Sequence, residues 1–286
     1  MSRCLISARE LEKLRTSSTT PLAIVDCRFD LADAAEGRRR YMEGHIPGAV
    51  YLDLEQDLSG ARGAHGGRHP LPEVWKLAST LGGVGISRDV RVVAYDAGDF
   101  MASRLWWLLR YLGHEQVQVL DGGFPAWREG GFPITDEIPA PQKADFIPEV
   151  QEGMKVDVAQ VERALCDPSV VLLDSREGKR YRGEEEPLDP VAGHIPGAKL
   201  FFWRESLTEE GRWKGAEQQR RRLEAVLAEA EGGSLAESAR QVILYCGSGV
   251  SACANVLALT EAGVPGVKLY PGSWSDWCSY PHLPIE

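Results

Sequence analysis

The chain has 286 residues, of which 43% are hydrophobic and 26% are charged. This composition is typical of a globular protein with a sizeable core, and it excludes a disordered or fibrous chain. The net charge of -10 disfavours non-specific nucleic-acid binding. No apolar run approaches the ~20 residues of a membrane-spanning helix, so we expect neither nucleic acid nor a membrane as a partner.

The N-terminal segment is charged and has no apolar stretch of the kind found in signal peptides. The cysteines include no CxxC pair and, in a chain of this length, do not read as the disulfide framework of a secreted domain. We therefore expect a cytoplasmic protein with reduced thiols. No His/Cys spacing typical of a metal site is present, so no metal is expected. The six cysteines are Cys4, Cys27, Cys166, Cys246, Cys253 and Cys278.

Four motifs occur twice, in the same order, along the chain. The first copies are IVDCR (24–28), GHIPGA (44–49), VVAYD (92–96) and LDGGFPAW (120–127). They return as LLDSR (172–176), GHIPGA (193–198), VILYC (242–246) and YPGSWSDW (270–277). The offset between copies drifts only from 148 to 150 residues. A repeat this regular indicates a duplicated domain, in agreement with the roughly 150 residues expected per domain.

Strands are predicted where short apolar runs rich in Val, Ile and Leu occur, as in buried parallel sheets. In chain order these runs are 23–26, 91–95 and 117–120, then 170–174, 241–245 and 266–270. Helices are predicted at 102–112 and 250–262, and they end at the glycines Gly113 and Gly263. This alternation predicts an α/β fold of two tandem domains, each a mainly parallel sheet flanked by helices.

A stretch rich in proline and charge, 135–153, predicts the connection between the domains. We expect a first domain at 1–140, a linker at 141–155 and a second domain at 156–286. The polar segment 208–239 is expected to form a solvated helix with loops. Its three arginines, at 220–222, are then part of a solvated face.

The two copies differ in chemistry directly after the strand 241–245. Cys246 stands there in YCGSGVSA, where Gly247 and Gly249 let the backbone curl so that N–H groups point inward. Such a nest, at the positive end of the following helix, favours a thiolate nucleophile. The first copy has Asp96 at this position, which cannot carry out thiol chemistry, and the nearby Asp99 would repel an anionic ligand. The first domain is therefore predicted to be catalytically inactive.

Taken alone, Cys246 could be a small buried residue at a strand end. The paired GHIPGA motifs, the CGSGVSA loop and the terminal GSW-x-x-W together resemble the tandem-domain rhodanese superfamily, most closely its 3-mercaptopyruvate sulfurtransferases. This resemblance covers nearly the whole chain. It implies two α/β rhodanese domains with the active site between them, on the second domain.

By this resemblance, Cys246 carries the transferred sulfur as a persulfide and needs no cofactor. The donor is a small molecule, 3-mercaptopyruvate, and pyruvate is released. The acceptor is a thiol, a thioredoxin-like protein or cyanide. Thiosulfate as the donor remains an alternative, and so does a non-catalytic sulfur-relay or interaction module.

The resemblance also assigns donor-binding residues. Arg180 matches the substrate-binding arginine of the family's G-R-[FY] element, although Lys179 replaces the preceding glycine. Arg176 is a further candidate, with a structural ion pair as the alternative. The catalytic loop completes the predicted donor site with Gly247, Gly249, Val250, Ser251 and Ala252.

Charge in this region bears on the choice of donor. The loop has no charged residue, which favours a donor with a single carboxylate over dianionic thiosulfate. Leu188 and Asp189 stand where mercaptopyruvate enzymes commonly have a second arginine, and this departure keeps thiosulfate open.

A Ser-His-acid relay is the last feature that the resemblance implies. Ser248 matches its serine, and His69 in RHPLP its histidine, with a surface histidine as the alternative. The acid is expected to be Glu55 or Asp57. A phosphatase with a Cys-x5-Arg loop is disfavoured, because Ala252 stands six positions after Cys246.

Overall fold

The computed structural model describes residues 3–17, 20–228 and 241–286. It divides into two units, which pass from one to the other between Gln151 and Glu152. Two short segments pack with the unit that does not contain their neighbours in sequence. Ala61–Leu71 belongs to the second unit and Glu209–Arg212 to the first. The segment 61–71, which carries His69, was expected in the first domain. Its packing with the second unit matters for the site described below.

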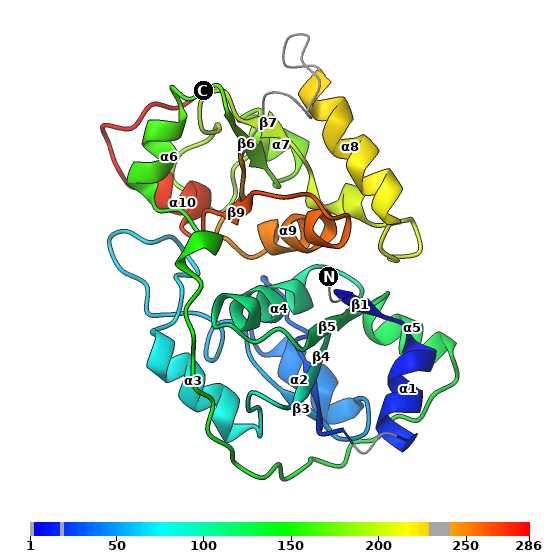
Figure 1. The fold of residues 1–286 in the computed structure, drawn as a ribbon. Coiled ribbons are helices and arrows are strands. Elements are labelled where there is room, and N and C mark those ends of the chain that lie inside the picture. The colour runs from blue at the N-terminus through cyan, green and yellow to red at the C-terminus, as the bar shows by residue number, and fades with distance from the viewer. Residues whose placement is uncertain (1–2, 18–19, 229–240) are drawn as a thin grey trace. The chain divides into compact units, whose positions relative to one another are not determined.

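The first unit is built on a five-stranded parallel sheet in the order β1-β5-β4-β2-β3. The strands are β1 (Leu5–Ile6), β2 (Leu22–Asp26), β3 (Ala49–Tyr51), β4 (Arg91–Tyr95) and β5 (Val117–Leu120). The helices are α1 (Ala8–Ser17), α2 (Glu36–Glu43), α3 (Val74–Gly83), α4 (Met101–Tyr111) and α5 (Gly123–Glu129). Figure 1 shows α3 and α4 on one side of these strands and α1 and α5 on the other.

Alternation along the central strand explains this layering. Val93 and Tyr95 of β4 point into a buried cluster with Leu11 of α1 and Trp127 of α5. Successive side chains of a strand point to opposite faces, so Val92 and Ala94 face the other side of the sheet, where α4 lies. Both faces of β4 are therefore buried, as its continuous apolar sequence predicts.

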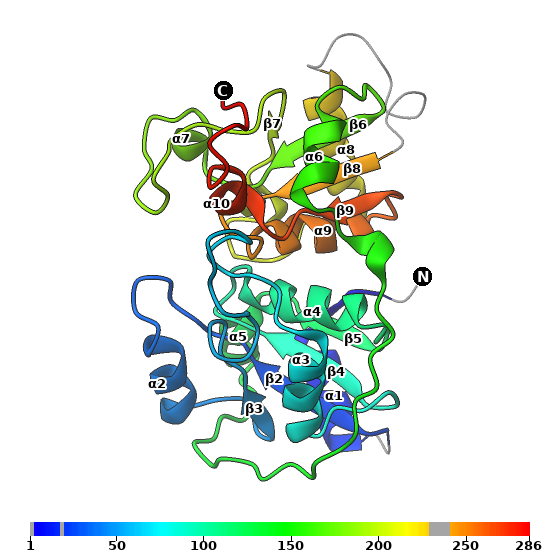
Figure 2. The same ribbon diagram turned by 90° about the vertical axis from the view of Figure 1, so that its left-hand side faces the viewer.

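The second unit has a four-stranded parallel sheet in the order β7-β6-β8-β9. Its strands are β6 (Val170–Asp174), β7 (Lys199–Leu200), β8 (Gln241–Tyr245) and β9 (Val267–Leu269). Its helices are α6 (Val158–Ala164), α7 (Gly178–Tyr181), α8 (Ala216–Ala228), α9 (Ala252–Glu261) and α10 (Ser273–Trp277), with short 3-10 helices at Glu152–Met154 and Trp203–Ser206. Figures 1 and 2 show α6 and α10 on one face of this sheet and α8 and α9 on the other.

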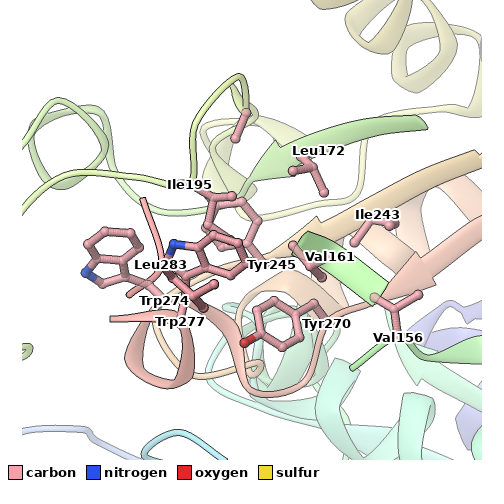
Figure 3. Close-up of a cluster of buried hydrophobic side chains, with 11 residues drawn as sticks. Val156, Val161, Leu172, Ile195, Ile243, Tyr245, Tyr270, Trp274, Trp277 and Leu283 are labelled. Atoms are coloured by element: carbon pink, nitrogen blue, oxygen red, sulfur yellow. The ribbon is translucent and has the colours of Figure 1, made fainter. Parts of the chain in front are cut away.

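Aromatic side chains fill the core between this sheet and α6 and α10. Trp274 and Trp277 of α10 are fully buried and pack with Tyr245 of β8 and Val161 of α6 (Figure 3). Trp277 donates its indole N–H to Pro284 O, and Trp274 donates to Val191 O. Buried tryptophans with satisfied N–H groups fix α10 rigidly against the carboxyl end of β8.

The predicted α/β fold of two mainly parallel sheets flanked by helices is confirmed, since all strand pairs in both sheets are parallel. The predicted bounds of β4, β5, β6 and β8 coincide with the observed ones. Gly113 and Gly263 follow α4 and α9 with φ of +81° and +75°, the left-handed conformation of a helix C-cap.

The polar segment differs from its prediction at one residue. Arg220 and Arg221 are exposed, but the side chain of Arg222 is only 10% exposed. Its guanidinium lies 3.6 Å from the ring centroid of Phe201 and donates to Asn255 Oδ1 at 3.0 Å. Arg222 therefore ties α8 to the core rather than facing solvent. Residues 229–239 of the same prediction lie outside the described residues. No helix among those described is both long and apolar enough to cross a bilayer.

Candidate active site

In both sheets, the chain leaves the two central strands in opposite directions. In the second unit β6 lies beside β8, and the chain continues from β6 to β7 on one side and from β8 to β9 on the other. In open parallel sheets, sites form beyond the carboxyl ends of strands at such a switch point. Cys246 is the first residue after β8. In the first unit the corresponding strand, β4, ends before Asp96.

The loop after β8 holds Cys246 in a buried nest. The Cys246 side chain accepts the N–H of Gly249 at its Sγ, 3.2 Å away, and the residue is 1% exposed. Gly249 has φ of +76°, and a Cβ there would overlap Pro271 O. Only glycine fits this turn, as the sequence predicted. Ser273, which the sequence analysis missed, accepts the N–H of Cys246 at its Oγ at 3.1 Å.

The same nest in the first unit is filled by a carboxylate. Asp96 accepts backbone N–H groups from Gly98 at 2.9 Å, Asp99 at 3.2 Å and Ala102 at 2.9 Å. Burial raises the pKa of Asp96, and these N–H groups act in the opposite direction. The first copy therefore shows how this loop surrounds a side chain that has two acceptor atoms. At the repeat offset, the three donors correspond to Ser248, Gly249 and Ala252.

The segment 61–71 is fixed on α10 of the second unit. Gly66 donates its N–H to Asp276 Oδ1 at 2.7 Å, and Arg68 donates its N–H to Ser275 Oγ at 3.0 Å. Asp276 also accepts the hydroxyl of Tyr270 at 2.6 Å. Asp276 has an alanine counterpart, Ala126, in the first copy. This difference between the repeats was the sequence signal that could have identified it.

This anchoring brings together two of the predicted relay residues. His69 Nδ1 and Ser248 Oγ are 2.8 Å apart, and both residues are buried, at 4% and 7% exposed. His69 is therefore not a surface histidine. The hydroxyl of Ser248 belongs to the loop of Cys246, so the pair places an imidazole ring beside that loop.

The predicted acids belong to the first unit. Glu55 and Asp57 lie in a turn after β3, where Asp53 Oδ1 accepts the N–H of Glu55 at 2.8 Å. Asp57 Oδ2 accepts the N–H of Asp53 at 2.8 Å, and burial raises the Asp57 pKa. Asp57 thus stabilises its own turn. The structure brings His69 and Ser248 together within one unit and places neither acid in that unit.

Arg176 is an internal support. Its side chain is 1% exposed, pairs with Asp174 at 2.7 Å and donates to Gly193 O at 2.7 Å. Burial opposes the charge, but Asp174 outweighs it and raises the Arg176 pKa. In the first copy Arg28 makes the same contacts, with Asp26 at 2.6 Å and Gly44 O at 2.8 Å. A contact present in both copies supports a structural role, in which each arginine holds its own GHIPGA loop.

The histidines of these loops repeat in the same way. His45 Nδ1 lies 2.7 Å from Tyr41 O, and His194 Nδ1 lies 2.9 Å from Tyr181 O. Each ring stacks on its tyrosine, with centroids 4.0 and 3.9 Å apart. Their shared geometry in both copies supports a structural role for the two histidines.

Arg180 lies beside the loop of Cys246, and so does Arg68, which the sequence analysis missed. A Cβ on Gly247 would lie 3.2 Å from Arg180 Nη1 and 2.8 Å from Arg68 Nη2. Asp189 forms ion pairs with both arginines, and Arg180 also pairs with Glu186 at 2.7 Å. The only sequence signal for Arg68 was its place directly before His69.

No group of three or more His, Cys, Asp or Glu side chains with the geometry of a metal site occurs in residues 3–17, 20–228 and 241–286. All six cysteines are free thiols, and Cys246 is the one held at the centre of this loop. The arrangement provides a buried thiol in an N–H nest, a hydroxyl–imidazole pair and two guanidinium groups. These are the components of a nucleophilic site for an anionic substrate.

Comparisons with known proteins match both units. The rhodanese-like domain profile matches residues 7–130 and 157–280. A probable 3-mercaptopyruvate sulfurtransferase of Pseudomonas aeruginosa is 42% identical over 94% of this chain and 93% of its own. A putative thiosulfate sulfurtransferase, SseB, of Mycobacterium tuberculosis is 38% identical over 98% and 96%.

Among solved structures, the 3-mercaptopyruvate sulfurtransferase SseA of Escherichia coli has a TM-score of 0.81 at 29% identity. The match covers 96% of this chain and all of that one. The Tum1 protein of Saccharomyces cerevisiae has a TM-score of 0.86 at 26% identity, and covers 100% of this chain and 99% of its own.

Proposed function

Because the chain belongs to the family of rhodanese-like domain proteins, we propose that it is a sulfurtransferase that uses 3-mercaptopyruvate as the donor. A persulfide on Cys246 carries the sulfur to a thiol, a thioredoxin-like protein or cyanide. The observation that carries the proposal is the nest around Cys246 Sγ, whose counterpart in the inactive copy holds the Asp96 carboxylate. The full-length similarity to proteins named as sulfurtransferases supports it.

In the first step the Cys246 thiolate attacks the thiol sulfur of mercaptopyruvate. A sulfur–sulfur bond forms and the carbon–sulfur bond breaks, with its electron pair staying on carbon. The carbon is reduced, and the cysteine sulfur and the transferred sulfur are oxidised together to the persulfide level. The proton of the donor thiol ends on the carbon, so that the products are pyruvate and the persulfide anion.

The persulfide anion extends Cys246 by one atom into the nest. In the first unit the second carboxylate oxygen of Asp96 accepts the N–H of Ala102 at 2.9 Å. The equivalent donor in the catalytic copy is the N–H of Ala252. We therefore assign the N–H of Gly249 to the cysteine sulfur and that of Ala252 to the outer sulfur. Fixed backbone donors aimed at a developing anion stabilise it without reorganisation.

The proton of the donor thiol passes through the Ser248–His69 pair. Their 2.8 Å contact lets the imidazole take a proton from the hydroxyl while that hydroxyl takes one from the donor. Glu55 remains a candidate for orienting His69.

In the second step the acceptor attacks the outer sulfur, and the Cys246 thiolate leaves. With cyanide the product is thiocyanate. Two half-reactions through one covalent intermediate predict ping-pong kinetics.

Thiosulfate is the second candidate donor. The absence of a family arginine at Leu188–Asp189 keeps it open, and the similarity to proteins named as thiosulfate sulfurtransferases supports it. Against it stands the uncharged loop from Gly247 to Ala252. We expect kcat/KM for mercaptopyruvate to exceed that for thiosulfate by more than about tenfold, which corresponds to ~1.4 kcal/mol. A ratio below one would reverse the choice of donor.

The free thiols fit a reducing compartment such as the cytoplasm. The activity itself is tested by incubating the protein with mercaptopyruvate and cyanide and measuring thiocyanate and pyruvate. We expect equal amounts of both products from the native chain and none from Cys246→Ser. Cys166→Ser, at an exposed thiol, is the matched control and should retain full activity. Absence of thiocyanate from the native chain with both donors would favour a non-catalytic module.

A further inference from the structure

Two guanidinium nitrogens converge on the residue that follows the nucleophile. The position of a Cβ on Gly247 is 2.8 Å from Arg68 Nη2 and 3.2 Å from Arg180 Nη1. Gly247 has no Cβ, so both guanidinium groups can pack closely against it. Because both nitrogens lie within about 3 Å of one point, they are close enough to each other to bind the same carboxylate or sulfonate group. Gly247 is adjacent to Cys246, which brings such a group next to the reacting sulfur.

Each of these two arginines is already held by a carboxylate through other nitrogens. Asp189 accepts from Arg68 Nη1 and, at 3.1 Å, from Arg180 Nη2. Glu186 accepts from Arg180 Nε at 3.2 Å. Within the parts of the chain that the structure describes, Arg68 Nη2 and Arg180 Nη1 make no hydrogen bond. The carboxylates therefore hold both guanidinium planes while they leave one donor on each directed at Gly247.

We propose that Arg68 is the second donor-binding arginine of this enzyme and that Asp189 sets the charge of the site. This inference rests on the proposed function. The anionic end of the donor bridges Arg68 Nη2 and Arg180 Nη1 beside the loop that begins at Cys246. Arg68 thereby takes the place of the arginine that is absent at Leu188–Asp189, from a segment far away in sequence.

Anchoring of the segment 61–71 explains how one loop can serve two purposes. The N–H of Arg68 is held by Ser275 Oγ at 3.0 Å, and the next residue, His69, contacts Ser248 at 2.8 Å. Donor binding and proton transfer are thus positioned by the same four-residue stretch from Gly66 to His69. The side chain of Arg68 is 21% exposed, so a substitution there leaves the core intact.

Asp189 accounts for the charge preference of the site. The arginines Arg68, Arg176 and Arg180 are balanced by the carboxylates of Asp174, Glu186 and Asp189, which gives an almost neutral cluster. A neutral cluster with two directed donors suits a monoanion better than a dianion. Removing the Asp189 charge adds one positive charge beside the donor. Because attraction scales with the charge on the donor, this gain is larger for thiosulfate than for mercaptopyruvate.

Four variants of the full chain test the proposal in steady-state assays with both donors and cyanide. Arg68→Gln removes one donor to the anion. Gly247→Ala places a methyl group against both guanidinium groups and displaces them, without a backbone penalty, because Gly247 does not have positive φ. Asp189→Asn removes the charge. Arg182→Gln is the control, at an exposed arginine of the same region that pairs with Glu184. Thermal unfolding of each variant verifies the fold.

For mercaptopyruvate we expect Arg68→Gln to raise KM at least about tenfold, the loss expected for a charge-assisted hydrogen bond, with kcat within about threefold. Arg68→Lys should recover part of the loss. Gly247→Ala should raise KM similarly, and it decides the question if Arg68→Gln unfolds. Asp189→Asn should increase the kcat/KM of thiosulfate relative to mercaptopyruvate by about tenfold. Arg182→Gln should match the native chain.

The outcomes separate the inference from the function on which it rests. If the native chain transfers sulfur but Arg68→Gln and Gly247→Ala keep KM within about twofold, the inference is overturned and the proposed function stands. If Asp189→Asn shifts both donors equally, its role in selectivity is wrong. If the native chain transfers sulfur from neither donor, the proposed function fails and this inference fails with it.

Discussion

Ser273 has a left-handed backbone conformation, and the equivalent position in the first copy is a glycine. Among the residues that the structure describes, Ser273 is the one non-glycine residue with positive φ, at 57°, and Gly123 at the equivalent position also has 57°. Such a conformation costs about 1–3 kcal/mol for most residues. The Ser273 hydroxyl offsets part of this cost, because it accepts the Cys246 N–H at 3.1 Å and donates to Tyr270 O at 2.9 Å.

Replacing Ser273 separates strain from hydrogen bonding. Ser273→Ala keeps the strain and loses the hydroxyl, so we expect it to lower the free energy of unfolding by about 1–2 kcal/mol. Ser273→Gly also relieves the strain and should be closer to the native chain in stability. Both should lower kcat, since the Cys246 N–H loses its acceptor. Denaturant unfolding and kcat measure the two effects, and native values for the alanine variant would contradict this account.

A second residue-scale feature is the acidic pair of the inactive copy. Burial, together with the charge of Asp96, raises the pKa of Asp99 well above its ordinary value, and burial raises that of Asp96. An acid with a raised folded-state pKa holds its proton more tightly in the folded chain than in the unfolded one. Its stabilising contribution is therefore present at low pH and is lost as pH rises through the folded-state pKa.

We expect Asp99→Asn to reduce this loss of stability. Between about pH 5 and about pH 8 the native chain should lose more of its thermal stability than the variant, by a few degrees in Tm. Differential scanning calorimetry of both proteins across this range measures the difference. Parallel pH profiles would show that the pair does not titrate as described. Sulfurtransferase activity should be unchanged, because Asp99 lies in the inactive copy.

At the scale of elements, the packing of segment 61–71 on α10 positions the site. Asp276 connects the two, since it accepts the N–H of Gly66 at 2.7 Å and the hydroxyl of Tyr270 at 2.6 Å. Asp276 contacts none of the reacting atoms. It acts through the segment that carries Arg68 and His69, and is therefore a positioning residue.

Asp276→Ala should loosen this segment. It leaves the buried Tyr270 hydroxyl without its acceptor, which costs about 1–3 kcal/mol, and it frees the part-buried N–H of Gly66. We expect faster tryptic cleavage after Arg62 and Arg68, a lower kcat and a higher KM for mercaptopyruvate. Asp136→Ala, at an exposed residue, is the control. Limited proteolysis followed by peptide mass analysis measures the effect, and an unchanged cleavage rate with native kinetics would exclude the positioning role.

The longer strands were predictable because a strand that is buried on both faces is a continuous run of apolar residues. β4, β6 and β8 are apolar on both faces, and this pattern needs no knowledge of the partner strand. The edge strands β1 and β7 have two residues each, too few for any periodicity. They form because a neighbouring strand offers hydrogen-bonding groups, which is a tertiary effect.

The site shows the same division. The Cys246 loop is local, so its glycines and the repeat comparison with Asp96 were sufficient to identify it. The contact of His69 with Ser248 was expected only from the family resemblance. Arg68 could not be found from sequence, because its role depends on where segment 61–71 packs. Arg176 could have been assigned as structural from Arg28, since both copies carry the same Asp-x-Arg pattern.

At the scale of the whole chain, comparing the two copies distinguishes the residues that support the fold from those proposed to react. Both copies keep the buried arginine that holds the GHIPGA loop and the tyrosine whose hydroxyl accepts that loop's Ile N–H, at 3.3 and 3.2 Å. Only the second copy has a thiol in the nest and a serine beside it. In the first copy the Asp96 carboxylate accepts the N–H groups of the loop, and so preserves the fold of the loop without a thiol.

The central claim is that Cys246 accepts sulfur as a persulfide, and peptide mass analysis after one turnover tests it most directly. The protein is incubated with mercaptopyruvate without an acceptor, alkylated and digested. We predict one added sulfur atom on the peptide that contains Cys246, its loss on addition of cyanide, and no such addition in Cys246→Ser. An added sulfur on another cysteine, or on the Cys246→Ser variant, would contradict the account.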